Sequence, residues 1–171
     1  MGKLSRRAIG LLLAFAVTYS VATCCHTLMV LQELNSLNIQ LDSATIVKSL
    51  VKDWLYMLPT YGVMLFVLLF SSFLLTTYVR HRVRFRGERI SRWIFPVVGA
   101  LAILLTLNML YPILDFTLIA GARGFWGMLL QGVAGLCGGL AYMYSVEWMR
   151  KRARGRAKQR HLTAKQRRST F

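Results

Sequence analysis

Four long apolar runs, separated by polar and charged connections, restrict the fold of this chain more than any other feature. The runs cover roughly residues 8–31, 54–79, 93–114 and 124–146. Each is long enough to cross a hydrocarbon core of about 30 Å at about 1.5 Å of rise per residue. A soluble domain of 171 residues, 56% of them hydrophobic, could not hide so much apolar surface while carrying a net charge of +16. The sequence therefore predicts an all-α polytopic membrane protein with a four-transmembrane-helix bundle.

The positive charges predict how this bundle is oriented. All 22 lysines and arginines except Lys48, Lys52 and Arg123 precede the first run, separate the second from the third, or follow the fourth. The positive-inside rule then places both termini and the Arg-rich central connection in the cytoplasm. We expect a single membrane domain over residues 1–149 and a basic cytoplasmic tail without regular structure over residues 150–171.

The basic tail narrows the choice of partners. Its stretch MRKRARGRAKQRHLTAKQRRSTF lacks the interleaved aromatic side chains of a surface on which nucleic-acid bases stack. Its cations can instead lie along anionic lipid head groups at the cytoplasmic face, where each contributes about 1 kcal/mol. Membrane lipids are therefore an expected partner, and nucleic acid is not.

The first run also has the composition of a secretory signal, with a basic start before an apolar stretch. Val21, Ala22 and Thr23 before Cys24 approach a lipoprotein cleavage site, although threonine is a poor residue before the cysteine. The apolar character resumes after His26, which makes the run too long for a signal core. We expect an uncleaved membrane anchor.

The connection after the first run predicts an outer amphipathic helix over about residues 43–53. Asp42 or Ser43 can cap its start. The apolar residues that recur at helical spacing along one face are Ile46, Val47, Leu50, Val51 and Trp54. Pro59 follows as a point where the second span can bend.

Groups that could carry chemistry are few. Cys24 and Cys25 are adjacent, so on a helix they point about 100° apart and do not converge on a metal ion, and Cys137 is alone. We interpret the three cysteines as small core residues and predict no metal or cofactor site. No spacing signature of a serine hydrolase, a glycosidase or a P-loop enzyme occurs, so the sequence predicts no catalytic site.

Four residues near the outer side form a candidate polar cluster, namely His26, Asn108, Asp115 and Arg123. An ionisable side chain such as His26 at membrane depth is by default a functional candidate. Near the head groups, however, such a side chain costs little free energy. Asp115 and Arg123 bracket a short outer turn, and we interpret them as an ion pair that closes it.

A stripe of glycines marks the fourth run and predicts close helix packing. The members of one broad face are Gly124, Gly127, Gln131, Gly135, Gly138 and Gly139. In lipid, small residues at four-residue spacing let helix backbones approach closely. Gln131 interrupts this face with an amide that, once buried, needs a hydrogen-bond partner such as Asn108, Thr23 or a backbone carbonyl.

The stretch IAGARGFWGMLLQGVAGLCGGLAY, with its Ala-Gly-Ala-Arg-Gly turn, Gln-Gly pair and Gly-Gly ending, resembles the final span of small four-helix bacterial inner-membrane proteins. The resemblance includes the basic central connection and the outer connection after the first run. It implies a bacterial inner-membrane location and this topology. It implies no activity, because that group carries none that could be transferred.

Two functions fit these features. The first is a non-catalytic accessory or interaction protein that packs, with another copy or with a membrane partner, through its Gly-rich fourth span. The alternative is a small solute or proton carrier whose route Gln131, Asn108, His26 and Asp115 would line. The packing function is favoured, because no ring of charge lies at mid-membrane depth.

Overall fold

The computed structural model describes residues 3–36, 42–83, 90–114 and 124–169. Its helices are α1 (Lys3–Ser36), α2 (Ser43–Tyr56), the π-helical turn η1 (Leu58–Gly62), α3 (Val63–Val83), α4 (Ile90–Leu114) and α5 (Gly124–Ser169). Within the described ranges only Asp42 and Met57 lie outside helices, and no strand occurs. The all-α class predicted from the sequence is therefore confirmed for this part of the chain.

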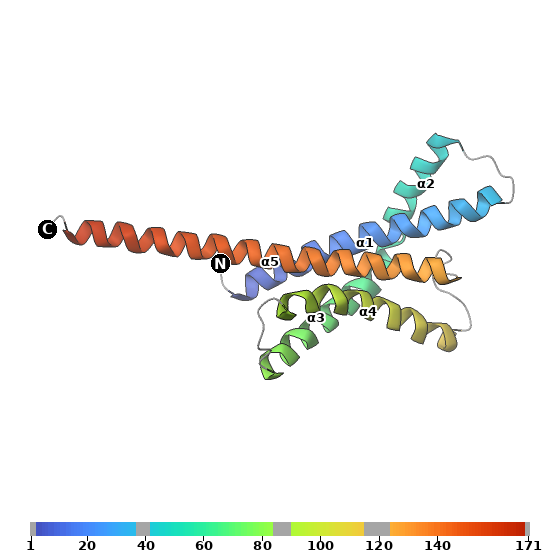
Figure 1. Cartoon of the computed structure of the whole chain (residues 1–171). Coiled ribbons are helices and arrows are strands. Elements are labelled where there is room, and N and C mark those ends of the chain that lie inside the picture. Colours follow the sequence, from blue (N-terminus) through green and yellow to red (C-terminus); the bar gives the residue numbers. More distant parts are fainter. Residues whose placement is uncertain (1–2, 37–41, 84–89, 115–123, 170–171) are drawn as a thin grey trace.

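The 46-residue α5 is the central element of the molecule (Figure 1). It makes its most extensive contacts with α1 and α4. α3 packs mainly against α4 and also touches α1, so these helices and the first half of α5 form one bundle. The second half of α5 projects beyond the other helices and carries the C-terminus away from them (Figure 1).

Three helical segments are long and apolar enough to cross a membrane, namely Leu4–Leu34, Leu58–Arg80 and Phe125–Arg156. Within the described part of α4 the apolar stretch is shorter, Trp93–Met109. Large apolar side chains such as Leu12, Val67 and Leu105 are more than half exposed on the outside of the bundle. So much outward apolar surface suits hydrocarbon and not water. The helices are compatible with a membrane protein, and a crossing by α4 stays a prediction.

The core consists of two buried clusters along the bundle, each with residues from α1, α3, α4 and α5. One contains Tyr19, Ala22, Tyr61, Leu65, Ile103 and Ala134. The other contains Ala14, Leu69, Phe73, Phe95 and Tyr142. In the second cluster the rings of Phe73, Phe95 and Tyr142 lie with centroids 4.8 to 5.7 Å apart, the range of favourable aromatic pairs.

The amphipathic helix α2 forms where the sequence predicts it and extends slightly further, to Tyr56. Asp42 occupies its N-cap position, but the Asp42 side chain makes no capping hydrogen bond. At η1 the Gly62 N–H donates to the Met57 carbonyl at 3.1 Å, which makes a wider turn than an α-helix. Pro59 explains the wider turn, because it has no N–H and its ring crowds the preceding turn. The location of α2 on the outer surface stays a prediction.

The sequence predicted a basic tail without regular structure over residues 150–171. In the structure, α5 instead continues as one helix to Ser169. Arginine, lysine, alanine and glutamine dominate this segment, and all four are strong helix formers. A helix that begins in the packed bundle can therefore propagate through them without a new nucleation step. Near the start of the segment the Arg152 guanidinium lies 3.6 Å from the centre of the Trp148 ring. We call residues 150–169 the arm.

Candidate functional site

The glycine stripe of α5 divides between two neighbouring helices, and the first of these is α4. A Cβ added at Gly135 would lie 2.8 Å from the carbonyl carbon of Gly99 and 3.0 Å from the Cα of Ala100. A Cβ at Gly139 would collide with the backbone of Phe95 and Pro96. Because a backbone cannot turn aside as a side chain can, α5 and α4 approach at a separation that only glycine permits.

The second neighbour is α1, which lies against Gly138. A Cβ at Gly138 would collide with the Thr18 hydroxyl and would lie 3.1 Å from the carbonyl oxygen of Ala14. Thr18 is buried and donates to that same carbonyl at 2.8 Å, so it cannot rotate away without losing this hydrogen bond. Gly127 is also buried, and Gly124 is the first residue of α5. Two helices of the same chain thus occupy much of the face that was expected to meet another protein.

Gln131 is fully buried where α5, η1 and α1 meet. Its Oε1 accepts a hydrogen bond from the Tyr61 hydroxyl at 2.8 Å, and its Nε2 donates to the Ala22 carbonyl at 3.2 Å. A buried amide left unpaired would cost about 1–3 kcal/mol, so these bonds both satisfy the side chain and fix three helices relative to one another. Of the partners predicted from the sequence, the backbone carbonyl is the one that the structure uses.

Tyr61 is the partner that sequence reasoning missed. In the sequence, Tyr61 is an aromatic residue near the start of the second run, where such side chains suit head-group depth. A usable signal was nevertheless present, because Tyr61 and Gln131 each lie about two turns after the start of their apolar runs. In the predicted topology those two runs start on the same side of the membrane, so the two side chains lie at similar depth.

The residues of the candidate polar cluster are not all placed by the structure. Asn108 is exposed, and its amide donates to the Leu104 carbonyl of its own helix at 2.9 Å, so it is not the partner of Gln131. His26 is half-buried on α1. Asp115 and Arg123 lie outside the described residues, and their ion pair stays a prediction.

A different group of polar contacts forms where α2 packs against α1. Thr27 Oγ1 donates to Asp53 Oδ2 at 2.9 Å. The Tyr19 hydroxyl donates to the Trp54 carbonyl, and the Trp54 indole N–H donates to Ser20 Oγ at 3.3 Å. These hydrogen bonds attach the last turn of α2 to α1. Their polar groups therefore have a structural role.

The cysteines carry no recognisable chemistry. Cys24 is exposed rather than in the core, whereas Cys25 and Cys137 are half-buried, and all three are free thiols. Across the described ranges, no three histidine, cysteine, aspartate or glutamate side chains lie close enough together to hold a metal ion.

A cavity of about 670 Å³ lies at the end of the bundle where α1 and α4 begin and α3 ends. The cationic side chains that line it are Arg7, Arg80, Arg150, Lys151 and Arg154. We call this cavity the basic pocket. It brings together residues from the three basic segments of α1, α3 and α5, which are far apart in sequence. Sequence reasoning identified these segments but not the cavity between them.

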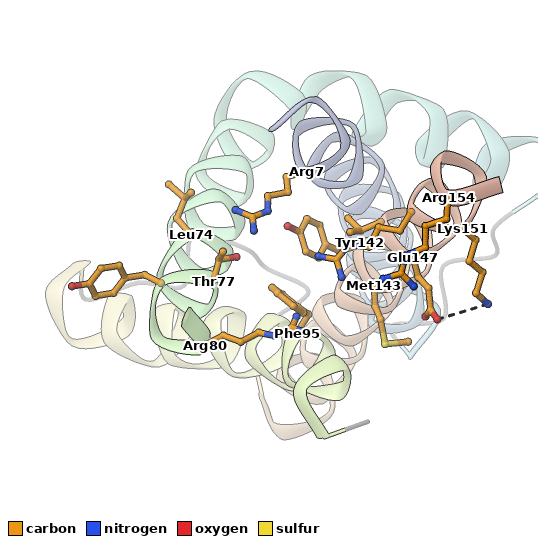
Figure 2. A pocket seen from close by; sticks show the side chains of 13 residues that line it. Arg7, Leu74, Thr77, Arg80, Phe95, Tyr142, Met143, Glu147, Lys151 and Arg154 are labelled. Atoms are coloured by element: carbon orange, nitrogen blue, oxygen red, sulfur yellow. Dashed lines mark ion pairs between the residues drawn. The ribbon is translucent and has the colours of Figure 1, made fainter. Parts of the chain in front are cut away.

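The wall of the basic pocket is aromatic and polar as well as cationic. Tyr142 is only 6% exposed and packs against Phe95 with ring centroids 4.8 Å apart. Figure 2 shows the Arg7 guanidinium and the hydroxyls of Thr77 and Tyr142 directed toward the same space. Such an arrangement offers charged and neutral hydrogen-bond donors to an anion.

No family model, curated protein or solved structure matches this chain. The resemblance to bacterial inner-membrane proteins therefore stays a prediction, and the geometry of the described residues carries the functional argument.

Proposed function

We propose that the protein is a non-catalytic accessory protein of the bacterial inner membrane, in which a four-span bundle holds the arm at the cytoplasmic face. The observation that carries this proposal is the continuity of α5, whose 46 residues pass from the centre of the bundle into a cationic helix (Figure 1). Because one helix forms both parts, the orientation of the bundle sets the orientation of the arm.

Two features of the bundle support an interaction through the arm rather than through the glycine stripe. The stripe packs against α1 and α4, and Gln131 uses its amide in hydrogen bonds within the chain. The arm, by contrast, exposes Arg152, Arg154 and Arg156. Arg152 and Arg156 lie four residues apart on one side of this helix. Exposed cations of this kind suit an acidic surface, here the cytoplasmic side of a membrane protein partner.

Crosslinking in cells tests this interaction. Gly155 has no atom of another residue near its would-be Cβ, so a photo-crosslinking amino acid fits there without disturbing a contact. We expect discrete protein adducts from position 155. The matched control is position 105, where Leu105 faces outward from α4 and the expected adducts are lipid. If position 155 gives no discrete protein adduct under conditions in which position 105 labels lipid, the proposed interaction is wrong.

Reporter fusions test the orientation and the number of spans. Alkaline phosphatase is active only outside the cytoplasm, so fusions after Gln40 and Leu118 are expected to be active. Fusions after Gly87 and Phe171 are expected to be inactive, because the positive-inside rule retains these basic segments. An inactive fusion after Leu118 together with an active one after Phe171 would contradict a crossing by α4.

A small solute or proton carrier is the alternative, and the buried hydrogen bond between Tyr61 and Gln131 favours it. Polar groups that can exchange partners inside a bundle are the means by which carriers hold a solute. Flux in proteoliposomes that disappears in Gln131→Leu and persists in Asn108→Leu would support the carrier. Absence of flux across a broad solute panel would favour the accessory protein.

A further inference from the structure

The basic pocket concentrates positive charge in a partly enclosed space. Five cations line it, and Glu147 is the one carboxylate among its described lining residues. That carboxylate lies 3.7 Å from the Lys151 amino group, one turn further along α5. Like charges around one space repel each other, and a bound anion would replace this repulsion with attraction.

The donors around the pocket suit the oxygens of a phosphate group. A guanidinium such as that of Arg7 can bind two phosphate oxygens side by side. The Thr77 and Tyr142 hydroxyls are directed toward the same space and can donate to a third oxygen (Figure 2). Tyr142 is nearly buried, so the position of its hydroxyl is set by the packing of its ring and not by the anion.

The remaining lining is apolar and extends toward the outside of the bundle. Phe95, Met143 and Val146 line the pocket, and Leu74 at its edge is mostly exposed on α3. A small soluble phosphate compound would leave this surface unused. The volume of about 670 Å³ lies within the range of about 300–1,000 Å³ that is typical of sites for small ligands.

The depth of the pocket is that of lipid head groups. Arg80 is the last residue of the apolar segment Leu58–Arg80, and Arg7 lies near the start of the apolar segment Leu4–Leu34. Apolar side chains thus face the hydrocarbon on one side of the pocket, and the cations stand at the ends of the spans.

We infer that the basic pocket binds an anionic phospholipid, with the phosphate held by the arginines and the two hydroxyls and the acyl chains passing over Leu74 into the bilayer. Three of the cations, namely Arg150, Lys151 and Arg154, belong to the arm. The inference does not rest on a protein partner of the arm, since the pocket lies at the ends of the spans whichever side of the membrane it faces. The ligand chemistry is a phosphate ester, which either a lipid or a soluble metabolite could present.

Native mass spectrometry of the purified full-length protein in detergent tests the inference. We expect phosphatidylglycerol to bind with an affinity at least about tenfold above that of phosphatidylcholine, whose choline cancels the phosphate charge. The double variant Arg7→Gln/Arg150→Gln is expected to remove that preference. The matched control Arg156→Gln removes a charge from an exposed position of the same helix, outside the pocket lining, and is expected to keep the preference within about twofold.

Thermal unfolding in the same detergent checks that each variant is folded. A second, milder variant is Arg7→Lys. It keeps the charge but loses the planar fork, so a reduced preference in Arg7→Lys supports bidentate phosphate binding. Equal losses in Arg156→Gln and in the double variant would overturn the inference, because they would indicate diffuse attraction to the whole basic region. Displacement of the lipid by millimolar glycerol phosphate would overturn the lipid assignment and point to a soluble phosphate ester.

Discussion

Residues 124–149 and 150–169 belong to the same helix, yet the two parts of α5 have very different surroundings. In the first part, glycines touch the backbones of α4 and α1, and Gln131 is fully buried. In the second part, Gly155 has open space around it, and Arg152 and Arg156 are exposed. Close backbone contacts require glycine in the first part of α5, whereas no contact requires it at position 155. Substitutions of glycine therefore compare the packing of the two parts directly.

The largest effect is expected for Gly135→Leu. The new side chain would run into the Gly99 backbone, which cannot move without separating α4 from α5. We expect a loss of about 3 kcal/mol or more in the free energy of unfolding, together with a low yield of folded protein. Thermal unfolding in detergent measures this, and Gly155→Leu is the control that should unfold like the wild type. If the two variants unfold alike, the two halves of α5 do not differ as described.

A smaller effect is expected for Gln131→Leu. This change leaves the Tyr61 hydroxyl and the Ala22 carbonyl without their partner, at an expected cost of about 1–2 kcal/mol. Tyr61→Phe should cost less, because it removes only one bond to the amide. In the double variant the two losses should not add, and strict additivity in this cycle would contradict the hydrogen bond between the two side chains.

A weaker and more local effect is expected at the junction of α1 and α2. Thr27→Val removes the hydrogen bond to Asp53 while it keeps the shape of the side chain, so we expect a loss of about 1 kcal/mol. Hydrogen exchange should become faster in α2 and remain unchanged in α5. Thr45→Val is the control, since Thr45 is exposed on α2 and should leave the exchange of that helix as it is.

The smallest effect is expected for Gly155→Ala in the arm. Unlike the other substitutions, it should stabilise the helix locally. Alanine favours an exposed helix over glycine by about 1 kcal/mol, so local hydrogen exchange in the arm should slow. Thermal unfolding of the bundle should not change, because nothing in the bundle packs against this position. Unchanged exchange around residue 155 would indicate that the arm is not one continuous helix.

Much of this architecture could be predicted because its causes are local along the chain. Runs of apolar residues determine where long helices form, and the spacing of apolar residues in α2 determines its amphipathic face. The four-residue spacing of Gly135 and Gly139 places them on one side of α5 whatever lies beside it. The basic tail was predicted to lack regular structure, but the packed start of α5 supplies the helix nucleus that an isolated tail of this composition lacks.

Which groups meet across the bundle was decided only by the tertiary structure. The sequence required a partner for Gln131, but the choice of Tyr61 and Ala22 depends on which helices are neighbours and at what depth their side chains meet. The basic pocket has the same origin, since Arg7 and Arg80 are far apart in the sequence and belong to different helices. Contacts along one helix follow from residue spacing alone, whereas contacts between helices depend on how all of them pack together.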